Sequence, residues 1–327
     1  MIFLCREDIE KIFKMEDALN AVEEAYIAHA HGEIVMPPKM DLHLDKGLLR
    51  YMPAYVRSID SAGAKIVNIH PQNPRESSLP TVMALIVINN PATGEPIAVM
   101  DGTYITAMRT GAAGGISAKY LSRKDASVVG MVGAGVQARG QLMALIQVRN
   151  ISEVKVYDMY RDASERFARE VGETLDIQIT TVESAKEAVV GSDIVVTTTT
   201  SRKPVVMNEW VDIGTHVCAV GADTPGKREL DLSLLKRGKI VVDDVSQSTT
   251  IGELNIPYRD GLIELEEIYG EIGEIIIGRK EGREAEDEIT IFDTSGLAAQ
   301  DIISAHHILN DAKRKKIGLV LTTSSWC

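Results

Sequence analysis

The chain has 327 residues, of which 45% are hydrophobic and 25% are charged, and its formal net charge is −12. This length allows two domains with substantial cores, and the composition is that of an ordinary globular protein. The acidic balance argues against nucleic acid as a partner, because phosphate binding needs a basic surface. The basic residues 313–316 form a single helical turn, which is typical of a solvated helix end.

Cysteine usage and the N-terminal residues predict the compartment. Cys5, Cys218 and Cys327 are widely spaced and show neither a disulfide framework nor the paired spacing of metal ligands. The first eight residues become acidic too early for a signal peptide, and no apolar run reaches membrane-spanning length. We therefore expect a soluble, cytoplasmic protein with no metal site and no membrane partner.

The first part of the chain is expected to form a helix followed by a β-rich unit. Apolar residues recur at helical spacing over residues 7–30, and Gly32 is a typical helix stop. Extended segments follow at 40–44, 48–52, 62–70, 82–89 and 97–100, and residues 45–47 predict a hairpin turn between the first two. The small residues of 103–121 then predict a helix that leads out of this unit.

From residue 126 to about 242, predicted strands and helices alternate. The strands are 128–132, 154–158, 177–181, 194–198, 216–220 and 239–242, and the helices between the earlier ones are 140–148, 163–171 and 184–190. This alternation predicts a parallel sheet with helices on both faces. Residues 264–278 are expected to be helical, 289–293 to form a last strand, and 298–313 to form an amphipathic helix that rejoins the N-terminal unit.

The stretch from Val128 to Ala138 predicts a phosphate-binding turn. A short apolar strand runs into Gly133 and Gly135, and Ala138 completes the G-x-G-x-x-G/A pattern. The first glycine permits the tight turn, the second lets the backbone approach a pyrophosphate, and the small third residue lets the helix pack on the strand. Asp158 ends the next strand about twenty residues further on, where a carboxylate binds the adenosine ribose hydroxyls. We expect a Rossmann dinucleotide-binding domain; a turn that is tight only for packing is the alternative.

Two cations lie in apolar or small-residue surroundings. Lys65 belongs to an apolar strand pattern, where it either faces solvent at a sheet edge or is buried. A buried lysine has a pKa shifted toward neutrality and can act as an acid, a base or a carbonyl polariser. Arg109 lies in a helix of small residues that lets a ligand come close, which favours a phosphate or carboxylate partner. An arginine that extends from a buried helix to solvent is the alternative.

Three further charged residues suit substrate chemistry. Asp223 follows a strand of the α/β domain, and ligands bind beyond the carboxyl ends of such strands. It is a candidate for proton transfer, although an aspartate at this place can also cap a turn. Lys39 and Arg50 flank the first hairpin, and each is either a ligand for a substrate carboxylate or a surface cation.

Four segments together resemble the ornithine cyclodeaminase/mu-crystallin family. They are residues 63–71, 107–112, 132–138 and 221–227, with the sequences GAKIVNIHP, AMRTGA, VGAGVQA and GADTPGK. The resemblance covers almost the whole chain and is strongest to the archaeal-type L-alanine dehydrogenase branch. It implies an α/β fold in which a Rossmann dinucleotide-binding domain, 115–296, is inserted into a second α+β domain, 1–114 plus 297–327. The second domain would bind substrate and form a homodimer by pairing its sheet with that of its partner.

The resemblance also implies roles for individual residues. Lys65 would be the active-site lysine and Asp223 the acid/base carboxylate. Lys39 takes the place of a carboxylate-binding arginine of the cyclodeaminases, a change that loses a bidentate fork. The residues around the dinucleotide would be Thr81, Arg109, Gly133, Gly135, Val136, Gln137, Asp158, Thr200, Val220, Lys227 and Thr294.

Arg50 departs from the cyclodeaminase pattern. A glutamate that holds the distal amine of the substrate is expected at this position in the cyclodeaminases, and a cation there would repel the second ammonium of ornithine. Arg50 instead suits a small amino acid or 2-oxo acid whose carboxylate it helps to bind. Asp158 favours NAD over NADP because it would repel a ribose 2′-phosphate, and the nearby Arg161 weakens that preference.

The sequence therefore predicts an NAD-dependent amino-acid dehydrogenase that converts L-alanine to pyruvate and ammonium, reversibly. Lys39 and Arg50 would anchor the carboxylate, while Asp223 and Lys65 exchange protons. Which of these two activates water stays open. The alternatives are a ketimine reductase, a cyclodeaminase acting on another diamine, and a non-enzymatic, mu-crystallin-like protein that binds a dinucleotide or a small ligand.

Overall fold

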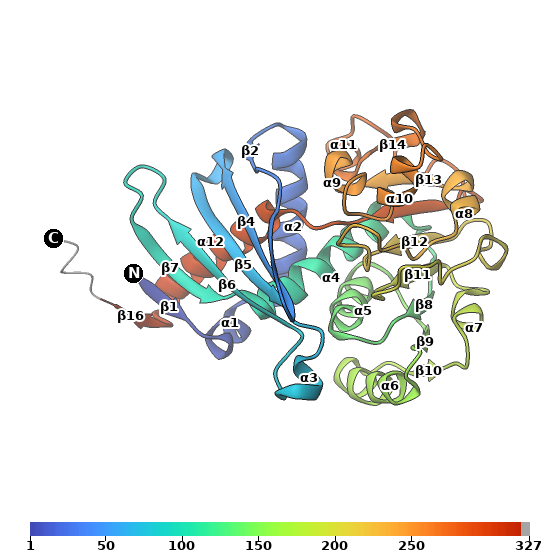
Figure 1. Cartoon of the computed structure of the whole chain (residues 1–327), viewed down its shortest axis with the longest axis horizontal. Coiled ribbons are helices and arrows are strands. Elements are labelled where there is room, and N and C mark those ends of the chain that lie inside the picture. The colour runs from blue at the N-terminus through green and yellow to red at the C-terminus, as the bar shows by residue number, and fades with distance from the viewer. Residues whose placement is uncertain (322–327) are drawn as a thin grey trace. The chain divides into compact units, whose positions relative to one another are not determined.

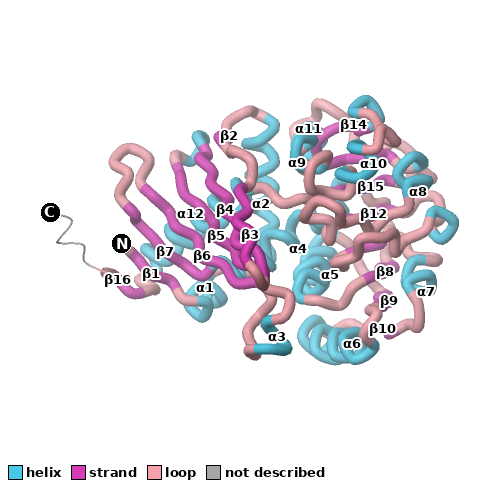
Figure 2. Tube along the Cα trace, in the orientation of Figure 1, coloured by secondary structure: helices cyan, strands magenta, loops and turns pink. Residues whose placement is uncertain are grey.

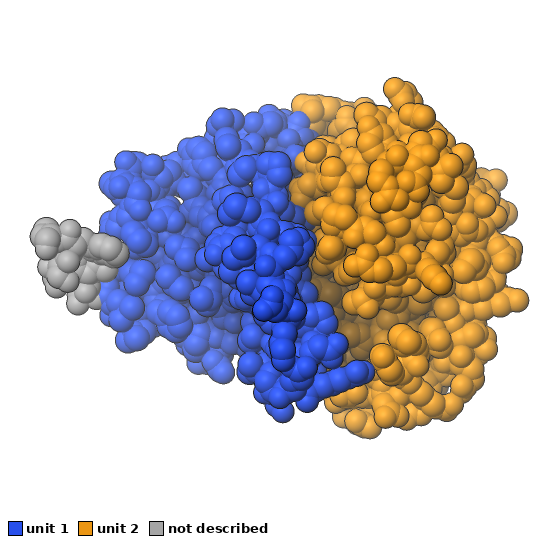
Figure 3. Space-filling model, in the orientation of Figure 1, with its two compact units in different colours: residues 1–109, 297–327 blue, residues 110–296 orange. Residues whose placement is uncertain are grey.

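A computed structural model of the protein describes residues 1–321 and divides into two compact units. The first unit is Met1–Arg109 together with the segment that begins at Leu297, and the second is Thr110–Gly296 (Figure 3). The division lies inside helix α4 (Gly102–Leu121), and the predicted boundary at 114/115 lies in the same helix. Among residues 1–321, no helix has the length and apolar composition needed to cross a membrane.

The first unit contains an eight-stranded sheet that packs against helices. Its strand order is β16-β1-β7-β6-β5-β4-β2, and β3 also pairs with β4 (Figure 1). The strands are β1 (Ile2–Leu4), β2 (Ile34–Val35), β3 (Met40–Leu44), β4 (Gly47–Val56), β5 (Ser61–Ile69), β6 (Val82–Asn89), β7 (Pro96–Asp101) and β16 (Leu319–Val320). The helices are α1 (Arg6–Ile12), α2 (Met15–Ala30), α3 (Asn73–Glu76) and α12 (Ala298–Lys315), with the 3-10 turn η1 (Arg57–Ile59).

Helix α12 packs against one face of this sheet (Figure 2). It contacts β4, β5, β6 and α2. Every second residue of β4 is buried, starting at Leu48, so a single face of the strand points into the core. The C-terminal helix thus rejoins the N-terminal unit, as the amphipathic pattern predicts.

The single helix predicted for residues 7–30 is wrong, because the structure has two helices there. Phe13 and Lys14 adopt extended backbone between α1 and α2, and the Phe13 side chain is buried. The carboxylate of Asp17 accepts a hydrogen bond from the Lys14 N–H at 2.8 Å, which caps the second helix. Capping chemistry and burial of Phe13 therefore interrupt the apolar periodicity.

The second unit contains the predicted parallel sheet. The strand order is β10-β9-β8-β11-β12-β15-β13-β14, and every pairing between its described strands is parallel. The strands are β8 (Val128–Val132), β9 (Glu153–Tyr157), β10 (Ile179–Thr181), β11 (Ile194–Thr197), β12 (His216–Ala219), β13 (Lys239–Val242), β14 (Ile268–Glu271) and β15 (Thr290–Asp293). Helices α5 (Val136–Val148) and α7 (Ala185–Val189) lie on opposite sides of strands β8 and β9 in Figure 1.

The remaining helices of this unit are short, apart from α6. They are α6 (Arg161–Leu175), α8 (Leu232–Arg237), α9 (Val245–Ser248), α10 (Asn255–Arg259) and α11 (Ile272–Ile276), with the 3-10 turns η2 (Asn208–Trp210) and η3 (Leu265–Glu267). The helix predicted for 264–278 is wrong, because β14 and α11 occupy most of it. Ile268 and Gly270 pair with β13 and are buried, so tertiary pairing overrides the local helix propensity.

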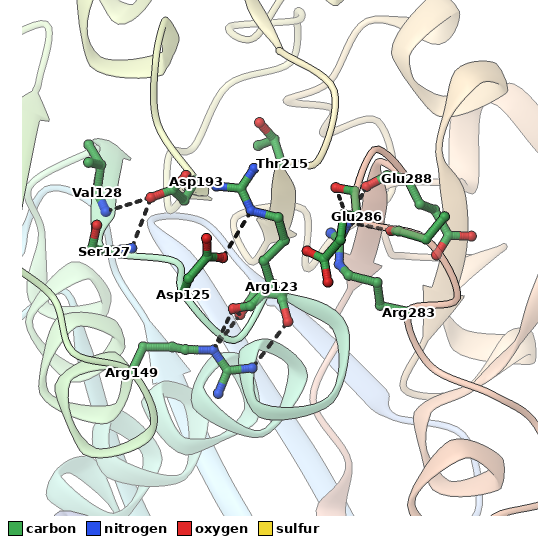
Figure 4. Close-up of polar contacts among 12 residues, drawn as sticks. Arg123, Asp125, Ser127, Val128, Arg149, Asp193, Thr215, Arg283, Glu286 and Glu288 are labelled. Atoms are coloured by element: carbon green, nitrogen blue, oxygen red, sulfur yellow. Dashed lines mark hydrogen bonds and ion pairs between the residues drawn. The ribbon is translucent and has the colours of Figure 1, made fainter.

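Two arginines bind carbonyls at the C-terminal end of α4. Arg149 donates to the carbonyl of Ala118 at 2.7 Å, and the Arg283 Nε–H donates to the Leu121 carbonyl at 2.8 Å. Just after the helix, Arg123 pairs with Asp193, whose carboxylate also accepts the N–H of residues 127 and 128 at 2.9 Å each (Figure 4). These bonds satisfy the last carbonyls of the helix and fix the start of β8, the strand that runs into the glycine turn.

Cysteines form no bridge within the described residues. Cys5 is partly buried and Cys218 is buried, and both are free thiols. Cys327 lies outside the described residues.

Candidate active site

A buried carboxylate in the first unit holds two cations. Lys65 on β5 is 1% exposed, and its Nζ lies 2.7 Å from Oδ2 of Asp301 in the first turns of α12. The Nε–H of Arg109 donates to the other oxygen of Asp301 at 3.1 Å. Arg109 also donates to the side-chain oxygen of Gln300 at 3.2 Å. Because one carboxylate faces two cations, the cluster has an excess of positive charge, which suits an anionic ligand.

The burial of Lys65 excludes the solvent-facing alternative. The pKa of Lys65 is lowered to about 7, chiefly by loss of solvation and also by the charge of Arg109, while Asp301 opposes both effects. A lysine that titrates near neutrality can both take up and release a proton under physiological conditions.

Arg50 lies on the same sheet face as Lys65. It pairs with Val67 across β4 and β5, and Val67 is two residues from Lys65, so the two side chains share a face. Arg50 is 4% exposed and forms a bidentate ion pair with Asp41 on β3, with distances of 2.7 Å from Nε to Oδ1 and 2.8 Å from Nη2 to Oδ2. The pair lowers the pKa of Asp41 and fixes the plane of the guanidinium. Arg50 is therefore a buried, oriented cation and not a surface one.

Lys39 completes a group of cations in this unit. It is partly buried just before β3, and its charge lowers the pKa of both Asp41 and Lys65. The charge of Lys39 thus acts both on Asp41, the partner of Arg50, and on Lys65. Thr81 lies just before β6, where its carbonyl accepts the His70 N–H at 2.8 Å.

The sequence-based prediction missed Asp41, Gln300 and Asp301. A signal for Asp301 existed, because this acid falls among buried apolar positions of an amphipathic helix, beside Ile302. The predicted hairpin, with its turn at 45–47, did not place Asp41 opposite Arg50. The turn in the structure has only two residues, 45–46, so it pairs Leu44 with Gly47 and residue 41 with residue 50.

The glycine turn of the second unit has the geometry expected for a phosphate site. Gly133 has φ +103° and its N–H donates to the Tyr157 carbonyl at 2.8 Å, so the turn needs glycine for its own conformation. Gly135 is the N-cap of α5, and a Cβ built there would meet no heavy atom of residues 1–321 within 4 Å. The protein's own packing does not explain this glycine, whereas close approach of a pyrophosphate does.

Two residues beside the turn have an uncovered apolar side chain or an unpaired polar atom. Val136 opens α5 with a side chain that is 67% exposed, and Oε1 of Gln137 is buried with no hydrogen-bond partner among the described residues. Ala138 is fully buried, as close packing of helix on strand requires. Exposed apolar surface and an unpaired oxygen beside a helix N-terminus fit a bound dinucleotide.

Asp158 helps to hold the glycine turn. Its carboxylate accepts the N–H of Ala134 and that of Tyr160, each at 2.9 Å. The neighbouring Arg161 pairs with Glu165 at 2.8 Å and with Glu183 at 2.7 Å, so acids neutralise the cation that weakened the preference for NAD. Binding of the ribose by Asp158 stays a prediction.

The other predicted residues of this unit follow the carboxyl ends of adjacent strands. Thr200 comes after β11, Val220 and Asp223 after β12, and Thr294 after β15. The Asp223 carboxylate accepts hydrogen bonds from Lys227 Nζ at 2.6 Å and from the neighbouring Thr224 hydroxyl at 3.2 Å. Lys227, predicted to contact the cofactor, thus orients the predicted acid/base in this structure.

A parallel sheet whose first crossover carries such a turn defines a dinucleotide-binding protein of the Rossmann type. The lysine of the other unit, buried and titrating near neutrality, adds a group suited to proton transfer. Comparison with known proteins narrows this class. Residues 1–316 match the ornithine cyclodeaminase/mu-crystallin family, and the chain belongs to that family.

Similar proteins include dehydrogenases and reductases. An alanine dehydrogenase of Archaeoglobus fulgidus is 50% identical over 97% of both chains. The solved structure of an archaeal alanine dehydrogenase dimer with bound NAD is 49% identical, covers 99% of both chains and has a TM-score of 0.94. A Thermococcus litoralis Delta(1)-pyrroline-2-carboxylate reductase, solved with NADH and L-proline, is 40% identical, covers 98% of this chain and 100% of its own, and also has a TM-score of 0.94.

These comparisons confirm the predicted family, the α/β fold class with a Rossmann-type domain, and NAD as the cofactor. The coarser part of the predicted activity, an NAD-dependent oxidoreductase of this family, is confirmed with them. The roles of the individual residues stay predictions.

Proposed function

We propose that the protein catalyses the NAD-dependent oxidative deamination of L-alanine to pyruvate and ammonium, and its reversal. The observation that carries this proposal is Arg50, a buried cation on the sheet face of Lys65, at the position where the cyclodeaminase pattern has a glutamate. A cation there favours a substrate with one carboxylate and no second ammonium. The similarity to alanine dehydrogenase, in sequence and in solved structure, supports the same choice.

In this proposal, cations of the first unit bind the substrate carboxylate. Arg50, held by Asp41, and Lys39 orient alanine so that its Cα hydrogen is available for transfer. The turn at Gly133 and Gly135 would hold NAD, whose nicotinamide would supply the acceptor for that hydrogen as hydride. Alanine then becomes an imine, which adds water and releases ammonium, so that alanine, NAD and water give pyruvate, ammonium, NADH and a proton.

Lys65 and Asp223 are the proposed proton carriers for water addition and ammonium release. Lys65 suits this role because its pKa is about 7. Asp223 suits it because Lys227 fixes its carboxylate at the carboxyl edge of the parallel sheet.

A ketimine reductase is the second candidate. The Thermococcus litoralis reductase is 40% identical to this chain over nearly its whole length. The two reactions are related chemically, because each can transfer hydride to the carbon of a C=N bond beside a carboxylate. Reductive amination of pyruvate consumes ammonium from solution, whereas reduction of a cyclic ketimine does not. The substrate preference of the protein therefore distinguishes the two activities.

An assay with NAD and a panel of L-amino acids tests the proposal. We expect formation of NADH with alanine that exceeds the rate with ornithine, lysine or proline. Proline and ammonium formed from ornithine without net NADH would instead identify a cyclodeaminase. Binding of NADH without turnover of any amino or imino acid would identify a binding protein.

The variant Arg50→Gln tests the carboxylate anchor. Loss of a buried, charge-assisted contact of about 1.5–3 kcal/mol should raise KM for pyruvate by one to two orders of magnitude. Arg57→Gln is the matched control, because Arg57 is exposed just after the end of β4. Equal pyruvate kinetics in both variants would contradict the role proposed for Arg50.

We further propose that the protein forms a homodimer through the sheet face opposite α12. On this face β3 and β6 expose large apolar side chains, namely those of Met40, Leu42, Leu44 and Leu85. Exposed large apolar side chains gathered on one face of a sheet are typical of an interface. The related archaeal alanine dehydrogenase is a dimer, which supports a second copy of this chain as the occupant.

A further inference from the structure

Glu229 joins two segments at the carboxyl edge of the parallel sheet. The residue is fully buried. Its Oε1 accepts the N–H of Thr199 at 2.6 Å, and its Oε2 accepts the N–H of Gly221 at 2.8 Å. Oε2 also accepts the hydroxyl of Thr197 at 2.7 Å. One carboxylate therefore connects the chain after β11 with the chain after β12.

The contact leaves no room for a side chain at Gly221. A Cβ built at this glycine would lie 2.6 Å from Cδ of Glu229 and 2.1 Å from the carbonyl oxygen of Thr199. Both distances are shorter than carbon–carbon and carbon–oxygen contacts allow, so the three groups pack directly against each other. Each of these three hydrogen bonds to the carboxylate comes from a donor, which is the pattern of an acceptor-only, ionised group.

Two further buried residues bind the chain near the end of this loop, Glu253 just beyond it and Asn255 within it. Glu253 accepts the N–H of Glu229 at 2.9 Å and that of Leu230 at 2.7 Å. Asn255 accepts the Gly226 N–H and donates to the Lys227 carbonyl, each at 2.9 Å. The loop from 220 to 228, which carries Asp223, is therefore supported at its start by Glu229 and beyond its middle by Asn255.

We propose that Glu229 is a positioning residue that fixes the Asp223 loop and the Thr199–Thr200 backbone for the reaction. The inference rests on the proposed function in one respect, namely that Asp223 exchanges a proton with the reacting substrate. Glu229 is predicted to touch neither substrate nor cofactor. It acts through Gly221, two residues before Asp223, and through Thr199, the neighbour of Thr200.

The variant Glu229→Gln tests this role because it preserves size and removes one acceptor. A carboxamide nitrogen cannot accept a hydrogen bond, so the N–H of either Thr199 or Gly221 loses its partner. Glu253→Gln is the matched control, since Glu253 is an equally buried acid that binds backbone N–H groups away from those two positions. Thr197→Val is a milder variant that deletes one donor to Glu229 and keeps the side-chain shape.

Amide hydrogen exchange and steady-state kinetics give two independent readouts. In Glu229→Gln we expect exchange at residues 199–201 and 221–224 to accelerate about tenfold or more, as loss of one buried hydrogen bond allows. We also expect kcat with NADH, pyruvate and ammonium to fall by about one to two orders of magnitude, because a small misplacement of a catalytic group lowers the rate by about this much. KM for pyruvate should change less than about threefold, since Glu229 is not expected to contact the substrate. Thr197→Val should change both readouts in the same direction by a smaller factor.

The control separates positioning from stability. Glu253→Gln should lower Tm, accelerate exchange at 229–230 and leave kcat within about threefold of the unmodified protein. Equal losses of kcat in the two glutamine variants, or unchanged exchange at 221–224 in Glu229→Gln, would overturn the proposal. If the unmodified protein fails to turn over pyruvate, the proposed function fails, and the exchange data still decide whether Glu229 holds the loop.

Discussion

At the scale of single residues, the ion pairs of Asp301 explain how Lys65 can be both buried and charged. Asp301 counteracts the desolvation and the charge of Arg109 that together depress the lysine pKa. Without a carboxylate at 2.7 Å, a lysine that is 1% exposed would stay neutral to a lower pH. The helix that closes the first unit therefore also sets the protonation state of its candidate catalytic group.

The variant Asp301→Asn should lower the pKa of Lys65 below about 7. In the unmodified protein this lysine is charged below that pH and neutral above it. In the variant Lys65 stays neutral down to a lower pH. The limb of the kcat/KM profile that reports the titration of Lys65 should therefore move to lower pH. A profile of kcat/KM from pH 5 to about 9 measures the shift.

Asp311→Asn is the matched control, because Asp311 lies on the same helix and pairs with Arg314 and Lys315 at the surface. Its profile should coincide with that of the unmodified protein. A limb that stays in place in Asp301→Asn, or moves to higher pH, would rule out the electrostatic role of Asp301.

Sequence motifs were enough to select Lys65, Arg109 and Asp223 as candidates, but not their partners. Arg109 and Asp301 lie 192 positions apart, and their contact depends on how α12 packs on the sheet. Periodicity predicts that α12 has an apolar face and does not predict which strand residue that face meets.

At the scale of elements, a buried histidine connects α4, β12 and β15. The two ring nitrogens of His216 lie 3.0 Å from the Ser117 hydroxyl and 2.9 Å from the Thr290 hydroxyl. Thr290 in turn donates to the Leu121 carbonyl at 2.9 Å, at the end of α4. Burial lowers the pKa of His216 to about 3, so the ring is neutral in the folded protein near neutral pH.

His216 should make folding sensitive to acid. Between about pH 6.5, where the unfolded histidine titrates, and pH 3, near its folded pKa, the unfolded state takes up a proton that the folded state does not. Stability is thus present above the unfolded pKa and is lost as pH falls toward the folded pKa. His216→Gln should cost about 1–3 kcal/mol at pH 7 and lose less additional stability on acidification.

Chemical denaturation at pH 7 and pH 4.5 measures both effects. His307→Gln is the control, since His307 is partly exposed and its pKa is raised by Glu24. An acid-induced loss of stability in His216→Gln equal to that of the unmodified protein would contradict the assignment.

Element types followed from the sequence where local pattern and tertiary contacts agree. The apolar strands of the parallel sheet were predicted because both faces are buried, as in β11 and β12, where every residue is buried. Prediction failed at Phe13 and at β14. In each case a cap or a strand pairing outweighed helix periodicity, and neither is visible in the spacing of apolar residues alone.

At the scale of the whole molecule, the proposed dimer predicts that charges placed in its interface reduce the mass in solution from that of a dimer to that of a monomer. Leu42→Glu combined with Leu85→Glu places two charges on the exposed sheet face, and burying them would cost several kcal/mol. We expect the double variant to be a folded monomer by light scattering coupled to size exclusion. Leu262→Glu, in a loop of the second unit where the leucine is also exposed, should stay dimeric.

A monomeric unmodified protein at micromolar concentration, or a double variant that keeps the mass of the dimer, would contradict this interface. Exposed apolar residues of β3 were visible in the sequence as an alternating strand. The spacing alone does not show that these side chains are exposed. They are exposed because α12 packs on the opposite face of the sheet.

The discontinuous arrangement of the first unit was predictable because only the last amphipathic helix lacked a place in the alternating pattern. The substrate was not predictable to the same degree. Dehydrogenases and reductases of this family share the fold, the cofactor and the chemistry of a C=N bond, so the decision depends on a few side chains such as Arg50.

The most direct test compares kcat/KM for pyruvate at saturating ammonium with kcat/KM for Δ1-pyrroline-2-carboxylate, both with NADH and one preparation of the protein. We predict that pyruvate is preferred by at least about tenfold, with L-alanine as the product, because Arg50 and Lys39 select a small carboxylate. A preference for the cyclic imino acid, with L-proline as the product and no ammonium consumed, would contradict the assignment as an alanine dehydrogenase.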